Sequence, residues 1–155
     1  MTQLVETVAG VLIGISAGVP ATFDATGYAA LTYTNIGEIT DGGSHGRKYA
    51  LVTHKPIASR GTQKYKGSFD EGQKTLQVGL DDDEPGQVLA KTASKSDANY
   101  AFKVTYQGGS VDYFQAKVMS FEKATGNVDS IRSGTIMLEL TTSATGIGIV
   151  EVAGA

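Results

Sequence analysis

The chain has 155 residues, with 20 glycines, no cysteine and no tryptophan, and its formal net charge is −3 at pH 7. This length suits one domain, and the lack of cysteine excludes a disulfide framework, a thiolate zinc site and a thiol nucleophile. The negative net charge argues against a general nucleic-acid binder, which needs a basic surface. Frequent Thr, Val and Tyr, with glycine at the turns, favour a mainly β protein.

The first two predicted strands cover residues 8–16 and 29–40. The apolar stretch at 8–16 has no basic residue before it and is shorter than the ~20 residues of a membrane span, so it is read neither as a secretory signal nor as a membrane helix. We expect a soluble chain made in a cytoplasm, without a membrane span. Gly14, Ser16 and Gly18 spell GxSxG, but no helical pattern follows, so we interpret them as a glycine-rich strand end.

Charge is segregated along the chain. The first basic residue is Arg47; residues 1–46 carry a net −4, residues 47–74 a net +5 and residues 75–155 a net −4. The neighbouring stretch 41–62 holds several glycines and Pro56, although residues 48–53 inside it have strand character. A segment of this length in a compact domain is usually functional or mobile. We predict a long protruding loop at about 41–62.

The following elements are a strand at 75–80 and one α-helix at about 85–95. Pro85 suits the first helical position, and the acidic residues 81–84 before it suit a helix N-terminus. A divalent-cation site in this acidic run is the alternative, but four consecutive acids lack the alternate spacing of a calcium loop. The helix is expected to pack across the sheet.

The clearest hairpin lies at residues 100–122. Aromatic and apolar side chains alternate from Tyr100 to Tyr106, and the glycine pair 108–109 supplies the tight turn. The neighbours Tyr113 and Phe114 break the alternation, which predicts either a bulge or burial on both faces. Strands at 133–142 and 147–152 complete an antiparallel β-sandwich or barrel.

Signals for catalysis or cofactor binding are weak. His45 and His54, the two histidines, lack a metal-binding spacing, and we read both as exposed polar loop residues. No phosphate-binding or dinucleotide-binding glycine motif is present. Most tyrosines fall on strand positions that look buried, which disfavours a sugar-binding or base-stacking surface. We therefore expect no enzyme activity, no metal and no cofactor.

Several stretches together resemble the major tail tube proteins of long-tailed, siphophage-type bacteriophages. None of the stretches is specific alone, but their order and the chain length match over roughly residues 15–142. The matching stretches are residues 20–24, 27–31, 36–39, 66–69, 80–83 with 86–87, 102–106 and 112–114.

This resemblance implies a β-sandwich or half-barrel with one helix at its side. Six subunits would form a ring, and stacked rings would form a tube through which genomic DNA passes without sequence-specific binding. The implied partners are further copies of the chain, the tail terminator, the tape measure protein and the baseplate, and the implied location is the virion tail. We expect a single tail-tube-type domain over residues 1–155, with an N-terminal arm or strand at 1–19 and no C-terminal immunoglobulin-like domain.

The charge segregation suggests how rings stack. We expect the loop at about 41–62 to reach a neighbouring ring, where complementary charge would fix the register. The basic candidates are Arg47, Lys48, Lys55 and Arg60. The acidic candidates are Glu38 and Asp41, or the acids at 81–83. The polar strand face formed by Lys103, Thr105 and Gln107 is the candidate lining of the lumen.

Other interpretations stay open at this point. A tail terminator, a baseplate ring or a secretion-type tube subunit would share the architecture. A carbohydrate-binding β-sandwich is the alternative from a different class. For the charges of the loop, the alternative is a solvated, mobile surface without a partner.

Overall fold

A computed structural model describes residues 5–154. Of the N-terminal arm or strand predicted at 1–19, the first four residues lie outside this range. Ten strands and two helices are present in the described part of the chain. In chain order they are β1 (Leu12–Ser16), α1 (Ala25–Ala29), β2 (Thr34–Asn35), β3 (Ile39–Asp41), β4 (Lys48–His54), β5 (Gln63–Asp70), β6 (Gln73–Gly79), α2 (Pro85–Ser94), β7 (Tyr100–Thr105), β8 (Val111–Ala124), β9 (Ser133–Thr141) and β10 (Val150–Val152).

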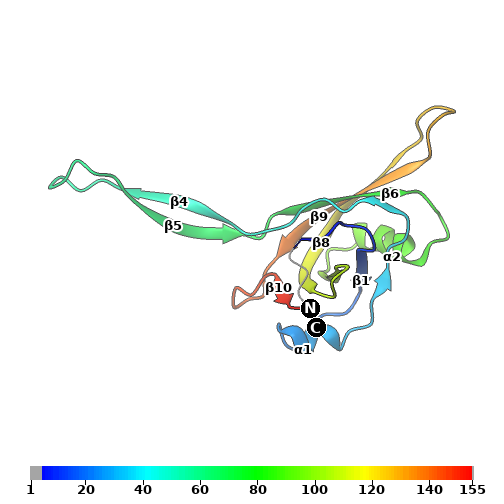
Figure 1. Ribbon diagram of the computed structural model, residues 1–155, viewed down its shortest axis with the longest axis horizontal. Coiled ribbons are helices and arrows are strands. Elements are labelled where there is room, and N and C mark those ends of the chain that lie inside the picture. The colour runs from blue at the N-terminus through cyan, green and yellow to red at the C-terminus, as the bar shows by residue number, and fades with distance from the viewer. Residues whose placement is uncertain (1–4, 155) are drawn as a thin grey trace.

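Eight strands form one antiparallel sheet in the order β2-β1-β7-β8-β9-β6-β3, and β10 pairs with the start of β8. The sheet curls into a half-barrel, as expected for the predicted fold class. The remaining strands, β4 and β5, pair only with each other and extend away from the body as a long ribbon (Figure 1). The hairpin of β8 and β9 projects from the body in another direction.

The core fills the inner face of the half-barrel, which we define as the face that packs against α2. Phe102 and Phe114 stack there at 5.5 Å between ring centroids, and both are fully buried. Alternate residues of five strands supply most of this cluster, joined by Ala90 and Ala93 of α2: Ile13, Ile15, Leu76, Val78, Val104, Ala116, Val118, Ile136, Leu138 and Leu140. Their period of two follows from strand geometry, which sends successive side chains to opposite faces.

A second, smaller cluster covers the outer face of β7 and β8. Tyr28 from α1 stacks on Tyr113 at 5.4 Å between ring centroids, and both side chains are buried. Tyr113 and Phe114 therefore face opposite clusters, so the pair reflects burial on both faces of the sheet. The ladder between β8 and β9 shifts register at Met119 instead.

The predicted turn at 108–109 and the predicted helix at about 85–95 are both confirmed. Gly109 has φ +95°, which favours glycine, and its N–H donates to the Tyr106 carbonyl. The helix α2 is capped by Glu84, whose carboxylate accepts from the Gly86 and Gln87 N–H groups. The acidic run before α2 thus contains the N-cap, as the helix interpretation proposed.

The expected single strand at 29–40 is wrong. The helix α1, capped by Asp24 through the Gly27 N–H at 2.8 Å, extends to Ala29, and only 34–35 and 39–41 form strands after it. Glu38, with φ +60°, then interrupts the extended backbone between β2 and β3. The predicted protruding loop at 41–62 protrudes only from Lys48 onward, and there it is a β-ribbon that continues to Asp70.

Candidate assembly surface: the protruding arm and its anchor

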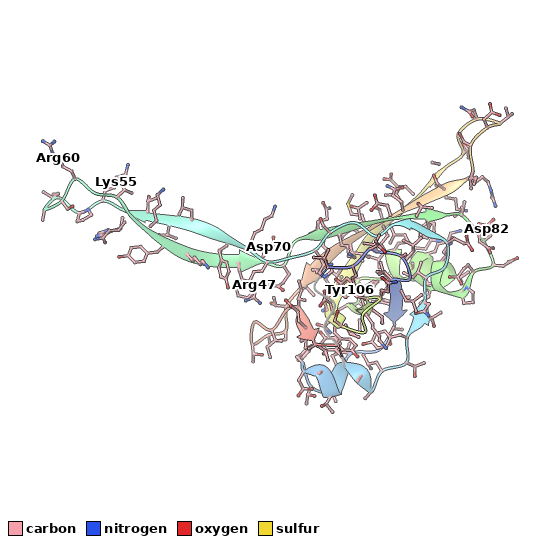
Figure 2. The ribbon with its side chains drawn as sticks, in the orientation of Figure 1. Arg47, Lys55, Arg60, Asp70, Asp82 and Tyr106 are labelled. Atoms are coloured by element: carbon pink, nitrogen blue, oxygen red, sulfur yellow. The ribbon has the colours of Figure 1, made fainter. Side chains whose placement is uncertain are left out.

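The arm, defined as residues 48–70, consists of β4, β5 and the tip loop 55–62 between them. The two strands pair in antiparallel fashion from Lys48 opposite Asp70 to His54 opposite Gln63. Both β4 and most of β5 are exposed to solvent along their length. Lys55 and Arg60 lie in the tip loop, far from the body of the molecule (Figure 2).

The arm and its base concentrate positive charge. Residues 47–66 hold six of the 13 Lys and Arg residues and none of the 16 Asp and Glu residues. The rest of the chain therefore has seven bases against 16 acids, a net −9. The cations at the tip, Lys55 and Arg60, have no acidic partner among the described residues. Opposite charges on the arm and body favour contact between the arm of one molecule and the body of another.

Arg47 anchors the base of the arm within its own chain. Its guanidinium donates from Nε to the Glu71 carboxylate and lies 3.8 Å from the centroid of the Phe69 ring. Glu71 is almost fully buried and also accepts from the N–H of Ile149 at 2.8 Å. One carboxylate therefore joins the arm to the C-terminal segment before β10. Arg47, predicted as an inter-ring contact, already has this intramolecular partner.

A polar cluster lies next to this anchor on the inner face. The Nε2 atom of His45 is 2.8 Å from Asp112 Oδ2, and its Nδ1 is 3.1 Å from Lys74 Nζ. Tyr106 also donates its hydroxyl proton to Asp112, at 2.7 Å. Lysine has only donors, so Lys74 donates to Nδ1, and the Nε2–H of His45 then donates to Asp112. The reading of His45 as an exposed loop residue is wrong, because its side chain is 10% exposed and packs on Phe114.

Burial shifts the titration of two members of this cluster. Desolvation lowers the pKa of Lys74 below its usual value, although the charges of Asp112 and Asp41 partly oppose this shift. Burial also raises the pKa of Tyr106, and its hydrogen bond to Asp112 adds to the effect. The cluster therefore holds Tyr106 protonated as a donor to Asp112 at neutral pH. Its hydrogen bonds fix the segment that leads into the arm.

The segment 42–46 lies along β6, between β3 and the arm. A Cβ on Gly43, which has φ +66°, would be 2.2 Å from the carbonyl oxygen of Thr75. Only glycine fits this close backbone approach with a left-handed conformation. The start of the arm is thus fixed by backbone packing at Gly43, by His45 and by Arg47.

The other predicted site residues lie elsewhere. Glu38 and Asp41 are exposed residues at the β3 edge of the sheet, away from the arm tip. Lys103 and Thr105 lie half-buried on the outer face of β7, and Gln107 lies in the turn that follows. These placements do not test their predicted contacts with a second ring or with a lumen, which stay predictions.

The structure also places the residues of the GxSxG stretch and the candidate metal ligands. Ser16 ends β1, and its buried hydroxyl accepts from the N–H of Gly18 at 3.2 Å, which is the strand end that the sequence predicted. Across residues 5–154 there is no group of three or more His, Asp and Glu side chains suited to hold a metal. None of the helices in the described range is long and apolar enough to cross a membrane.

Comparison with known proteins gives a likeness of fold. No protein-family model and no curated protein matches the chain. A solved structure of the sheath/tube terminator of PVC, an extracellular contractile injection system, in its extended state, superposes with a TM-score of 0.69 at 10% identity, covering 99% of this chain and 100% of that one. A chain from the anti-feeding prophage baseplate gives a TM-score of 0.66 at 10% identity, covering 99% and 98%. The chain therefore has a tail-tube-like fold.

The anchor was not visible in the sequence. Glu71, Lys74, His45 and Asp112 come from four separate segments, and no spacing rule connects them. One weak signal existed for Glu71, because it follows Asp70 at the end of a basic stretch that otherwise lacks acids. An acid that directly follows a run of bases is a candidate ion-pair partner.

Proposed function

We propose that this chain is a non-enzymatic structural subunit of a phage-like tail, which assembles into rings that stack into a tube. The proposal is supported by a fold likeness that covers nearly the whole chain and nearly all of two tail-component chains. The observation that carries it is the arm, a β-ribbon that protrudes from the body and, together with Arg47 at its base, holds six of the 13 basic residues opposite an acidic body. A monomeric protein gains nothing from such a ribbon, since an isolated two-stranded hairpin is marginally stable in water.

In this proposal the subunits form closed rings, with six as the expected number. A ring requires the same heterologous contact to repeat around the axis. The tip cations Lys55 and Arg60, with Lys48 at the base, meet acidic surface of the next ring, where Glu38, Asp41 and residues 81–83 are the candidates. The tube would let genomic DNA pass, and Lys103, Thr105 and Gln107 are the proposed lumen residues. The particle would be a virion tail of the siphophage type, assembled in the host cytoplasm with terminator, tape measure and baseplate partners.

Charge reversal at the arm tip tests the inter-ring contact. Arg60→Glu should raise the protein concentration needed for assembly at least 10-fold and reduce its sensitivity to salt, because the steering charge is removed. The matched control is Lys95→Glu, the same change of charge on an exposed residue of the body, and it should shift that concentration less than about threefold. Arg47 is not suitable for this test, because its reversal would also break the contact with buried Glu71. Wild-type assembly and salt sensitivity in Arg60→Glu would contradict the proposed contact.

A tail terminator or baseplate ring is the second candidate. The full-length superposition on a sheath/tube terminator favours it specifically. The two candidates differ in the length of the assembly, since a terminator forms one ring and a tube protein forms stacks of rings. Sedimentation velocity of the assembled protein separates them: a single discrete species supports the terminator, whereas a broad distribution of larger species supports the tube.

A further inference from the structure

The two faces of the arm differ in chemistry, and the strand register assigns each residue to one of them. Directly paired residues share a face, and alternate residues along a strand share it as well. The pairs Val52–Tyr65 and His54–Gln63 therefore define one face, and the pairs Leu51–Lys66 and Thr53–Lys64 define the other. A register shift between Tyr49 and Leu51 keeps Tyr49 and Phe69 on the same face as Leu51 and Lys66.

Side-chain contacts agree with this assignment. A Cβ on Gly67 would meet Val52 Cγ2 at 2.9 Å, so Gly67 lies on the face of Val52. The hydroxyl of Tyr65 donates to Gln63 on the same face at 2.9 Å. On the opposite face, Lys66 Nζ lies 4.7 Å from the centroid of the Tyr49 ring. We call the first the neutral face and define it as Ala50, Val52, His54, Gln63, Tyr65 and Gly67, with the oppositely charged pair Lys48 and Asp70 at its base; the other is the basic face.

The aromatic rings of the basic face contact cations of the same chain. The cations Arg47 and Lys66 lie over Tyr49, and Arg47 also lies over Phe69. Such contacts favour the aromatic surface staying beside its own cations. The neutral face has no such cover. Val52 and Tyr65 on this face are 47% and 55% exposed, and Leu51 on the basic face is 66% exposed, so both faces present apolar surface and the position of the lysines is what distinguishes them.

We infer that the neutral face of the arm is the surface that becomes buried against a second copy of this chain. This inference rests on the proposed function and specifies which side of the arm makes the contact. Charge indicates that the partner is a second copy of the chain. The arm and its base carry six cations, and the remainder of the same chain has a net charge of −9. The charges bring the arm to an acidic surface, but the centre of an interface is depleted of charged residues, since desolvating a lysine is unfavourable. Burial therefore falls on the face whose one lysine, Lys48, lies at the base of the arm opposite Asp70, while Lys64 and Lys66 stay hydrated.

The absence of cysteine from the whole chain permits a direct test with single thiols. Val52→Cys and Thr53→Cys place a thiol at adjacent, exposed positions of β4 on opposite faces. Each variant is labelled with a water-soluble maleimide as free monomer and as assembled protein. Labelling of Val52→Cys should slow at least 10-fold on assembly, whereas labelling of Thr53→Cys should change less than about threefold.

A second pair of variants uses assembly itself as the readout. Val52→Glu and Thr53→Glu make the same change of charge in the same strand, so their difference reports the face and not the charge. Val52→Glu should raise the concentration needed for assembly at least 10-fold more than Thr53→Glu does. The inference would be overturned if Val52→Glu and Thr53→Glu raised the assembly concentration equally. It would also be overturned if both thiols were labelled equally in the assembly, or if Thr53→Cys alone were protected. Each of these outcomes would leave the proposed function standing. A wild-type chain that never assembles would refute the proposed function, and the inference with it.

Discussion

The anchor at the base of the arm makes a quantitative prediction for Glu71. This side chain is 2% exposed and accepts from both the Arg47 guanidinium and the Ile149 N–H. Glu71→Ala leaves the Ile149 N–H without its partner, which costs about 1–3 kcal/mol, and also leaves a cavity. Breaking a fully buried ion pair costs about 3–5 kcal/mol, but Arg47 is 36% exposed and regains water. We therefore expect Glu71→Ala to lower the free energy of unfolding by about 2–4 kcal/mol.

Urea unfolding followed by circular dichroism measures this change. Glu122→Ala is the matched control, because it removes an exposed glutamate of β8 and should change the free energy of unfolding by less than about 0.5 kcal/mol. Hydrogen exchange adds a local readout, since the Ile149 amide should lose protection in Glu71→Ala. A loss of stability no larger than that of the control, with the Ile149 amide still protected, would refute the anchor.

Three further predictions concern backbone, burial and motion. Gly43→Ala should lower the free energy of unfolding, measured by urea unfolding, by about 2–3 kcal/mol, because its Cβ would clash with Thr75 at a positive φ. Gly46 has open space around it, so Gly46→Ala should be close to neutral. Equal effects of the two substitutions would contradict the packing at Gly43. Burial raises the pKa of Tyr28 to about 12, so the folded state holds this proton more tightly than the unfolded state, and the free energy of unfolding should fall as pH rises above about 10. Tyr28→Phe removes a buried hydroxyl that has no hydrogen-bond partner in the described structure, so it should be neutral or stabilising at pH 7 and should reduce the alkaline loss; a clear destabilisation would show that the hydroxyl is satisfied. Amides of the arm should exchange rapidly in the monomer and slowly after assembly, and uniform protection in the monomer would argue against ordering on assembly.

The parts of the fold that follow local rules were predictable. Aromatic and apolar side chains alternate along β7 and a glycine turn follows, while α2 has a proline and an acidic cap, so local sequence indicates each element. The stretch 29–40 was mispredicted because Asp24, which lies outside it, caps a helical turn that reaches Ala29. A positive φ at Glu38 also has no sequence signal, since only packing around it sets that conformation.

The candidate site was predictable in its charge and not in its contacts. The basic stretch is a property of composition, so its position could be read directly, and its protrusion was expected from its length. The loop prediction missed the β-ribbon past residue 62 because its lysines and glycine weaken the strand pattern. The partners Glu71 for Arg47 and Asp112 for His45 depend on how the half-barrel closes, which no local pattern specifies.

Negative-stain electron microscopy of the concentrated wild-type protein tests the central claim most directly. The proposed function predicts rings seen end-on and hollow tubes of stacked rings seen from the side. The protein concentration needed for this assembly should rise as salt is added. Single particles of monomer size at every protein and salt concentration would contradict it.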